Sequence, residues 1–294
     1  MSPLVGSGLW FGSRNTSHGL FFLSTSSAST PAITNKISFL TDSVLTGTNL
    51  SSGITTGGAS AGNTLFGVIL LSQNSTPVEI NTYTYANDSV SSGNSLNETG
   101  DNFIATGNST TGLFCGPGSN GGVGTTFLYN YSSNSFSSGT SLIDDQMQGQ
   151  TTGNATLAVI AVGSTTQTVT NVYTYSSNTV SSGTSLTNNN ASGAGAFGTS
   201  TVGYFQVLVA TNTAGYDIYN YSSNSITTTT PTIVFYSFMG ASCSNDSVGL
   251  ISKGNSTSSM YSCKMSTNSF SSSNALTSAT NNGGGSVSTN PGGF

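Results

Sequence analysis

The chain is poor in charge: its 294 residues include four Lys or Arg and nine Asp or Glu, which is 4% of the sequence and a net charge of -5. An ordinary soluble domain carries charge on about a quarter of its residues. Four cations, none of them clustered, do not neutralise a phosphate backbone, so we expect no nucleic-acid partner. No apolar run approaches the about 20 residues that a spanning helix needs, so we expect no membrane insertion. The N-terminus lacks a basic stretch followed by a long apolar core, so we expect no signal peptide.

Histidine and cysteine are also scarce, which limits the available chemistry. Any Ser-His-Asp triad would need the single histidine, His18, and no Gly-x-Ser-x-Gly elbow lies between a strand and a helix. We expect His18 to be a surface-loop residue. The three cysteines, Cys115, Cys243 and Cys263, lack the paired spacing of a disulfide framework or a zinc site. We expect Cys115 in the core and reduced thiols throughout, with a Cys243–Cys263 bridge left open.

The few carboxylates suggest turns more than catalysis. Asp144 and Asp145 are adjacent, but neighbours on an extended chain point to opposite sides, so they are a poor glycosidase pair. We expect them in a solvated turn, and we interpret Asp42, Asp88 and Asp246 as turn residues. The sequence therefore predicts no catalytic residue, no cofactor and no metal site, and we expect that the protein is not an enzyme.

The residues that are abundant indicate an all-β fold. Ser, Thr, Asn and 37 Gly supply the polarity, while 34% of the residues are hydrophobic and 10% aromatic. Apolar bursts bounded by turn-forming residues are typical of buried strands and argue against disorder. The clearest bursts are 20–23, 65–71, 156–162, 205–209 and 233–238. Strong helix formers are scarce and no segment has a helical period.

An internal repeat organises these bursts. Residues 129–142 are Tyr-Asn-Tyr-Ser-Ser-Asn-Ser-Phe-Ser-Ser-Gly-Thr-Ser-Leu, and 83–96 and 173–186 match closely. A fourth copy at 219–226 diverges into a Thr run, and degenerate copies stand at 37–50 and 263–276. The Asp or Asn of each copy occupies position 42, 88, 134, 178, 224 or 268, so the spacings are 46, 46, 44, 46 and 44. The register predicts six copies of one structural unit.

Each copy predicts a hairpin. The two aromatics lie on one strand face, where we expect them to pack against a neighbouring sheet rather than to stack on glycans. Ser-Ser-Asn-Ser supplies the turn, because Asn tolerates the left-handed conformation. The Gly that follows predicts a bulge or a close backbone contact. With an apolar strand and a Gly/Ala-rich segment upstream, each period holds about four strands.

The repeat resembles the Kelch repeat. Six positions separate the first aromatic from the apolar residue after the turn, as between Tyr129 and Phe136, and six positions also separate the doublet Gly121-Gly122 from Tyr129. The other copies lack the doublet, and Val, Phe or Ile replaces the Trp of Kelch repeats. The resemblance implies a divergent Kelch-like β-propeller. The copper oxidases that share Kelch propellers need more than one histidine ligand, so His18 alone excludes their chemistry. Sialidase-type propellers bind the substrate carboxylate with several arginines, and this chain has only Arg14.

The repeats predict one domain, a six-bladed propeller over 1–276, with blades at about 4–50, 51–96, 97–142, 143–186, 187–232 and 233–276. We expect 4–13 to supply the first strand of blade 1. The Gly/Ser/Asn-rich tail, 277–294, is left as a disordered end, a strand that closes the ring, or a docking arm. A parallel β-solenoid is the alternative fold, although its coils usually repeat at about half this period.

The Ser/Thr/Asn/Gly composition of the repeats also resembles repeat proteins of bacteriophage virions, notably those infecting cyanobacteria. This resemblance implies a virion-located structural protein, such as a tail fibre or appendage. Its expected partners are other virion proteins, further copies of itself, and a host-surface glycan or receptor. The alternatives are a cellular surface adhesin or S-layer-like protein and a propeller-type carbohydrate-active enzyme. We expect any binding site in the connections 97–103, 143–149 and 187–194.

Overall fold

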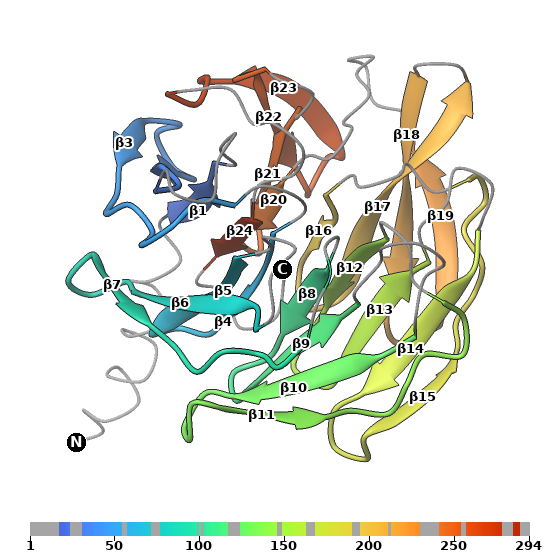
Figure 1. The fold of residues 1–294 in the computed structure, drawn as a ribbon. Coiled ribbons are helices and arrows are strands. Elements are labelled where there is room, and N and C mark those ends of the chain that lie inside the picture. The colour runs from blue at the N-terminus through green and yellow to red at the C-terminus, as the bar shows by residue number, and fades with distance from the viewer. Residues whose placement is uncertain are drawn as a thin grey trace, which may run out of the picture.

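Six antiparallel sheets of four strands each form the molecule, and the described residues contain no helix (Figure 1). The computed structural model describes residues 18–23, 31–54, 58–71, 77–98, 100, 103–116, 124–145, 149–162, 168–189, 195–210, 213–229, 241–253, 257–277 and 285–288. The sheets stand around a common centre as the blades of a six-bladed β-propeller, which confirms the predicted fold class.

Each blade runs from an innermost to an outermost strand, and we number the blades in chain order. Blade 1 holds β24 (Gly285–Ser288), β1 (His18–Phe22), β2 (Thr34–Ser38) and β3 (Val44–Thr46). Blade 2 holds β4 (Ala59–Gly62), β5 (Phe66–Leu71), β6 (Glu79–Thr84) and β7 (Ser89–Ser92). Blade 3 holds β8 (Ile104–Gly107), β9 (Thr111–Cys115), β10 (Thr126–Asn130) and β11 (Ser135–Ser138).

The second half of the ring repeats this order. Blade 4 holds β12 (Gln150–Gly153), β13 (Leu157–Ala161), β14 (Thr170–Thr174) and β15 (Thr179–Ser182). Blade 5 holds β16 (Phe197–Gly198), β17 (Val202–Ala210), β18 (Thr213–Asn220) and β19 (Ser225–Thr229). Blade 6 holds β20 (Ser242–Ser244), β21 (Val248–Ser252), β22 (Met260–Lys264) and β23 (Ser269–Ser273).

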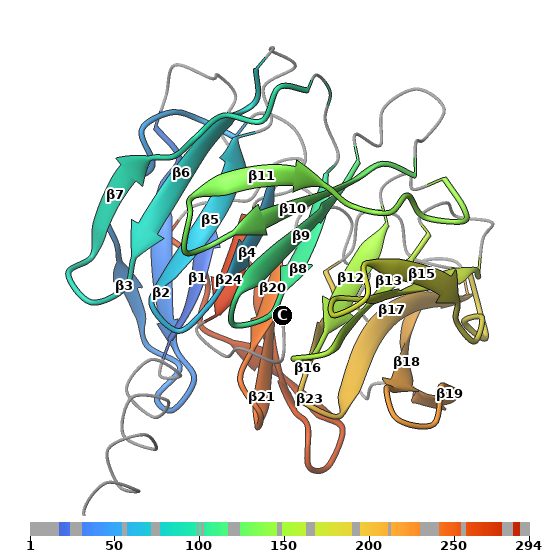
Figure 2. The same ribbon diagram turned by 90° about the horizontal axis from the view of Figure 1, so that it is seen from below.

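The ring closes through the C-terminal tail. β24 pairs with β1, Gly285 opposite Phe22, and contacts the inner strands β4 and β20 (Figure 2). Of the three roles left open for the tail, residues 285–288 therefore take that of a closing strand. The strand expected at 4–13 lies outside the described residues, as does the apolar burst 233–238, and β24 holds the place beside β1. Separate antiparallel blades exclude the parallel β-solenoid.

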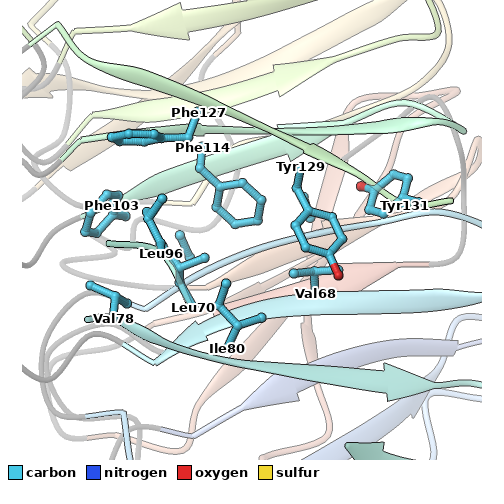
Figure 3. Close-up of a cluster of buried hydrophobic side chains, with 12 residues drawn as sticks. Val68, Leu70, Val78, Ile80, Leu96, Phe103, Phe114, Phe127, Tyr129 and Tyr131 are labelled. Atoms are coloured by element: carbon cyan, nitrogen blue, oxygen red, sulfur yellow. The ribbon is translucent and has the colours of Figure 1, made fainter. Parts of the chain in front are cut away.

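Hydrophobic cores fill the spaces between neighbouring blades. Figure 3 shows the core between blades 2 and 3, where Val68 and Ile80 face Phe114 and Tyr129. Five similar clusters join the other neighbouring pairs of blades. Full burial of an apolar side chain of this size stabilises a fold by about 1.5–3 kcal/mol. Burial is high in the inner strands and low in the outermost ones, which are mainly Ser and Thr and carry the exposed surface.

The repeated Asp or Asn adopts the left-handed conformation in every blade. Its φ lies between 49° and 56° at Asp42, Asp88, Asn134, Asn178, Asn224 and Asn268, and no other described non-glycine residue has a positive φ. Asn and Asp visit this region at lower cost than other side chains, which explains the residue type at the turn between the third and fourth strands.

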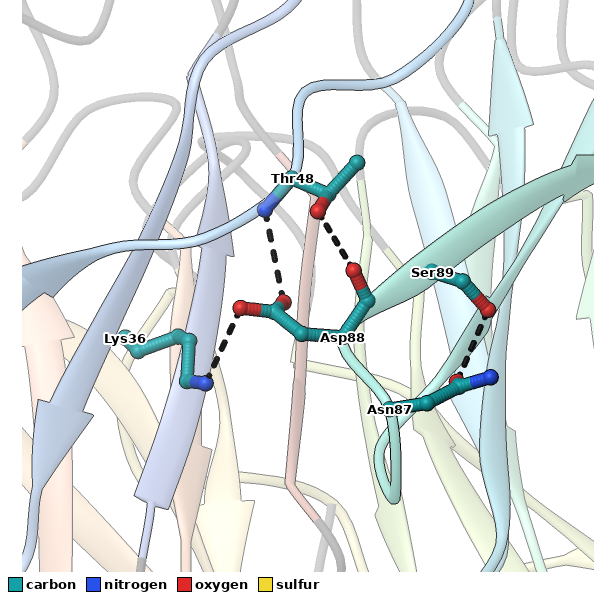
Figure 4. A network of polar contacts seen from close by, with 5 residues as sticks. All are labelled: Lys36, Thr48, Asn87, Asp88 and Ser89. Carbon is teal, nitrogen blue, oxygen red and sulfur yellow. Dashed lines mark hydrogen bonds and ion pairs between the residues drawn. The ribbon is translucent and has the colours of Figure 1, made fainter.

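The same turn residue clamps its blade to the preceding one. The Thr140 N–H donates to Asn178 Oδ1 at 2.9 Å, and the Thr184 N–H donates to Asn224 Oδ1 at 3.0 Å. In Figure 4 the corresponding Thr48 N–H donates to Asp88 Oδ1 at 3.3 Å, and Lys36 Nζ lies 3.3 Å from Asp88 Oδ2. The ion pair is partly exposed, so it adds at most about 1 kcal/mol.

The repeated Gly makes this approach possible. A Cβ on Gly139 would lie 2.3 Å from Thr126 Oγ1 and 3.1 Å from the Tyr173 hydroxyl of the next blade. A side chain at this position would therefore clash with Thr126 of its own blade and crowd Tyr173 of the next one. Of the two roles predicted for this Gly, the structure shows the close contact.

A second clamp is buried two residues before the first aromatic. Asn81 Oδ1 accepts the Ser51 N–H at 2.8 Å, and Asn171 Oδ1 accepts the Ile143 N–H at 2.8 Å. In blade 5 the residue is Asp217, fully buried, whose carboxylate accepts from the Thr187 N–H at 2.6 Å and from two threonine hydroxyls. Each clamp holds the segment that leaves one blade against the third strand of the next.

Candidate functional site

His18 is not a loop residue, which corrects the expectation from sequence. It is the first residue of β1, paired with Ser38 and half-buried. Burial and the nearby Lys36 charge lower the pKa of the imidazole. The Gly, Ser and Asn residues that precede His18 suggested a loop. The strand forms because residues 18–22 pair with β2, and a local sequence pattern does not reveal this pairing.

The carboxylates stay where the sequence placed them. Asp145 is exposed, and the half-buried Asp144 accepts the Asn171 amide at 3.3 Å, so the pair stands beside a structural clamp. Asp246 lies exposed in the turn between β20 and β21. No group of three or more His, Cys, Asp or Glu side chains gathers in the described part of the chain. Nor does that part contain a helix long and apolar enough to cross a membrane.

The three cysteines are buried free thiols. Cys115 packs in the core between blades 3 and 4, as predicted. Cys243 and Cys263 belong to one blade but are unpaired with each other. Burial raises the pKa of Cys115 and of Cys263 to about 12, so these thiols are protonated and unreactive at neutral pH.

The repeated tyrosines are packing residues, as predicted. Tyr129 and Tyr173 are at most 1% exposed, and each donates its hydroxyl hydrogen bond to the turn asparagine of its own blade. Of the second tyrosines, Tyr131 is buried and Tyr175 is half-buried with its hydroxyl buried, and burial raises the pKa of both well above the usual value. Neither aromatic is available as a platform for a sugar.

The three connections expected to bind a partner are equivalent to one another. Each leads from the outermost strand of one blade to the innermost strand of the next, and residues 99, 101–102, 146–148 and 190–194 in them lie outside the described residues. One connection lines a groove of about 340 Å³ between blades 2 and 3, where Asn97 and Glu98 face Phe127 and Phe136. Phe127 occupies the position in blade 3 that the clamp residue Asn171 occupies in blade 4.

A larger groove lies between blades 5 and 6. It has a volume of about 660 Å³ and is lined by Tyr204, Asp246, Lys264, Met265 and several Ser and Thr residues. We call it the blade 5–6 groove. These residues come from the turns β16–β17, β20–β21 and β22–β23 and from the strands beside them, rather than from the connections that the sequence singled out.

Sequence reasoning missed this groove, although the repeat contains a sign of it. The tyrosine pair of blades 2 to 5 becomes Cys263 and Met265 in blade 6, and Tyr204 replaces the Val or Leu found at its position in the other blades. The Tyr204 hydroxyl donates to Asn268 Oδ1 at 2.7 Å, so it replaces the hydrogen bond that a tyrosine at 263 would make. An exchange of residues between two blades thus marks the groove.

Comparison with known proteins concerns the fold. No protein-family model and no curated protein matches the sequence. The structure is similar to the crystal structure of TolB from Acinetobacter baumannii, with a TM-score of 0.63 over 92% of this chain and 67% of that one. The shared feature is the six-bladed propeller. Sequence identity is 9%, so the similarity extends to the fold and to nothing beyond it.

Proposed function

We propose that the protein is a non-enzymatic structural component of a virus particle, a ring in a tail fibre or appendage. It would contact other virion proteins and recognise a glycan on the host surface. We also propose that its blades are divergent Kelch-like repeats, on the spacing between Tyr129 and Phe136 and the doublet Gly121-Gly122, which lies outside the described residues.

The observation that carries this proposal is the neutral hydroxyl surface of the ring. The outermost strands, such as β7, β15 and β23, are built from exposed Ser and Thr with one apolar residue turned inwards. A surface with 4% charge in the whole chain has little long-range electrostatic steering. It suits short-range hydrogen bonds to glycans or to other neutral protein surfaces.

The polar clamps between blades support the same role. They tie successive blades at the turn residue and again in the third strand, so the ring is a rigid support for a contact surface. Apart from Glu98, which lines the groove between blades 2 and 3, the described carboxylates and the single histidine lie in turns, clamps and paired strands, which favours a structural protein over an enzyme.

The test is immunogold electron microscopy of virus particles and of cell envelopes from the source culture. Labelling of a tail or fibre supports the proposal, and labelling confined to the cell envelope would instead indicate an adhesin. An enzyme assay complements it. Hydrolysis of any member of a polysaccharide panel by wild-type protein, lost in Asp144→Asn or Asp145→Asn, would refute the non-enzymatic claim.

A further inference from the structure

The blade 5–6 groove differs from the borders before blades 3, 4 and 5, because blade 6 lacks the first tyrosine of the repeat and blade 5 carries the additional Tyr204. In blades 3, 4 and 5 the tyrosine that bonds the turn asparagine belongs to the same blade. In blade 6 the bond comes from Tyr204 of blade 5. Tyr204, Cys263 and Met265 pack together in the buried core between these blades, and the groove lies beside that core at the turns.

We propose that the blade 5–6 groove binds a neutral oligosaccharide. This inference deepens the proposed attachment role and rests on it only for the source of the glycan. The binding chemistry follows from the groove itself, from its shape, its polar groups and its balance of charge.

The wall of the groove is held in place before a ligand arrives. The Tyr204 ring stacks on Phe197 with centroids 4.8 Å apart and planes 6° apart, and the Tyr204 side chain is 2% exposed. Its hydroxyl lies 2.7 Å from Asn268 Oδ1 and 3.3 Å from the Met265 carbonyl. A wall fixed by stacking and hydrogen bonds loses little conformational freedom on binding, which favours affinity.

The polar groups along the groove suit a polyol. Thr199 Oγ1 accepts the Thr201 and Val202 N–H groups at 3.1 Å each, which fixes that hydroxyl in the turn. Further Ser and Thr hydroxyls line both sides, and each both donates and accepts. A sugar presents the same mixture of donors and acceptors, while the half-buried Val202 and Val248 offer apolar surface to the C–H face of a sugar ring.

The charges of the groove balance. Asp246 brings one carboxylate, whose Oδ1 accepts the Ser200 N–H at 3.3 Å, and Lys264 brings one ammonium. The carboxylate accepts from ligand hydroxyls and the ammonium donates to them, and such charge-assisted bonds are stronger than neutral ones. Asp246 would repel a net anionic ligand and Lys264 would repel a net cationic one, so a neutral ligand fits best.

The volume also fits. At about 660 Å³ the groove lies within the range of about 300–1,000 Å³ that is typical of small-molecule sites. It is open along the turns, so a chain of several sugar units can lie along it with its ends in solvent. These features together favour a short stretch of a longer glycan over a single small molecule.

The experiment begins with a printed array of neutral and acidic oligosaccharides probed with the labelled full chain, followed by titration of the strongest neutral hit by NMR. Ser271→Trp fills the groove from the outer strand. Ser181→Trp is its matched control, because Ser181 is the equivalent exposed residue of blade 4 and lies outside the groove. We expect Ser271→Trp to weaken binding at least tenfold and Ser181→Trp to leave it unchanged.

A second pair of variants guards against misfolding. Asp246→Asn removes the carboxylate in the groove, and Asp145→Asn removes an exposed carboxylate outside it. We expect only Asp246→Asn to weaken the titration, with unchanged melting temperatures for both. The proposal is overturned if the array shows no neutral binder or if Ser271→Trp and Asp246→Asn bind like wild type. Immunogold labelling reports on the virion role independently, so either proposal can fail alone.

Discussion

The turn asparagine Asn178 offers a direct test of how the blades are held together. Its φ of 50° places it in the left-handed region, and its Oδ1 accepts hydrogen bonds from the Thr140 N–H of blade 3 and from the Tyr173 hydroxyl of its own blade. Three substitutions separate these contributions: Asn178→Gly, Asn178→Ala and Asn178→Asp.

Asn178→Gly removes two hydrogen bonds and keeps the backbone conformation, because glycine adopts a positive φ without steric cost. At about 0.5–1.5 kcal/mol for each hydrogen bond, the free energy of unfolding falls by about 1–3 kcal/mol. Asn178→Ala loses the same bonds and adds about 1 kcal/mol for the left-handed conformation. Asn178→Asp keeps both the acceptor and the turn, and Asp42 and Asp88 occupy the same position in blades 1 and 2, so we expect a change within about 0.5 kcal/mol.

Urea unfolding followed by circular dichroism measures these differences. If Asn178→Gly and Asn178→Ala prove equally unstable, the left-handed turn contributes nothing and that part of the reasoning fails. If Asn178→Asp is as unstable as Asn178→Gly, the side-chain acceptor is not the clamp. The difference in unfolding free energy between Asn178→Gly and Asn178→Ala therefore measures the contribution of the left-handed turn. The difference between Asn178→Gly and Asn178→Asp measures the contribution of the side-chain acceptor.

The buried groups give four further predictions. Tyr129→Phe loses the hydrogen bond to its turn asparagine, so the free energy of unfolding should fall by about 0.5–1.5 kcal/mol. Tyr131→Phe loses no hydrogen bond to the described residues and should lower the free energy of unfolding clearly less. Equal decreases for the two variants would contradict this reasoning. Asp217→Ala leaves three donors without their acceptor and should lower the melting temperature markedly. Asp217→Asn introduces the residue that blades 1, 2 and 4 have at the equivalent position, so it should lower the melting temperature little. Because the pKa of Cys115 and of Cys263 is raised to about 12 in the fold, iodoacetamide at pH 8 should leave the native thiols unmodified and label all three cysteines in urea. In the unfolded chain the thiols release protons from about pH 8.5, whereas in the fold they stay protonated to higher pH. The thiols therefore stabilise the fold fully below about pH 8.5 and progressively less as the pH rises toward 12. The free energy of unfolding, measured at pH 8 and at pH 10, should be lower at pH 10.

Local chemistry made much of the fold predictable. The turn between the third and fourth strands needs a residue that accepts a positive φ, and Asn or Asp stands there in all six copies. The tyrosines at alternate positions lie on one strand face, and the Gly that follows marks a close approach. These features act over a few residues, so they appear in the sequence of each repeat, and the repeat then implies similar blades.

The candidate site was less predictable, because it depends on pairs of distant residues. Tyr204 and Cys263 can be interpreted only as a pair. Tyr204 supplies the hydroxyl group that the tyrosine at the position of Cys263 supplies in other blades. Binding by the variable connections stays a prediction, and the larger groove lies at the turns. A comparison of equivalent positions across blades, rather than of segments along one blade, would have detected the exchange.

The sequence by itself determined the all-β class, the period, the turn residues and the packing role of the aromatics, because each arises from backbone sterics and side-chain alternation within a short segment. Tertiary structure alone decided how the ring closes, where β24 pairs with β1 although Gly285 and Phe22 lie at opposite ends of the chain. It also decided that the larger of the two grooves lies at the turns between blades 5 and 6. Both outcomes depend on which surfaces meet when the six blades form a ring, and a local pattern of residues does not carry that information.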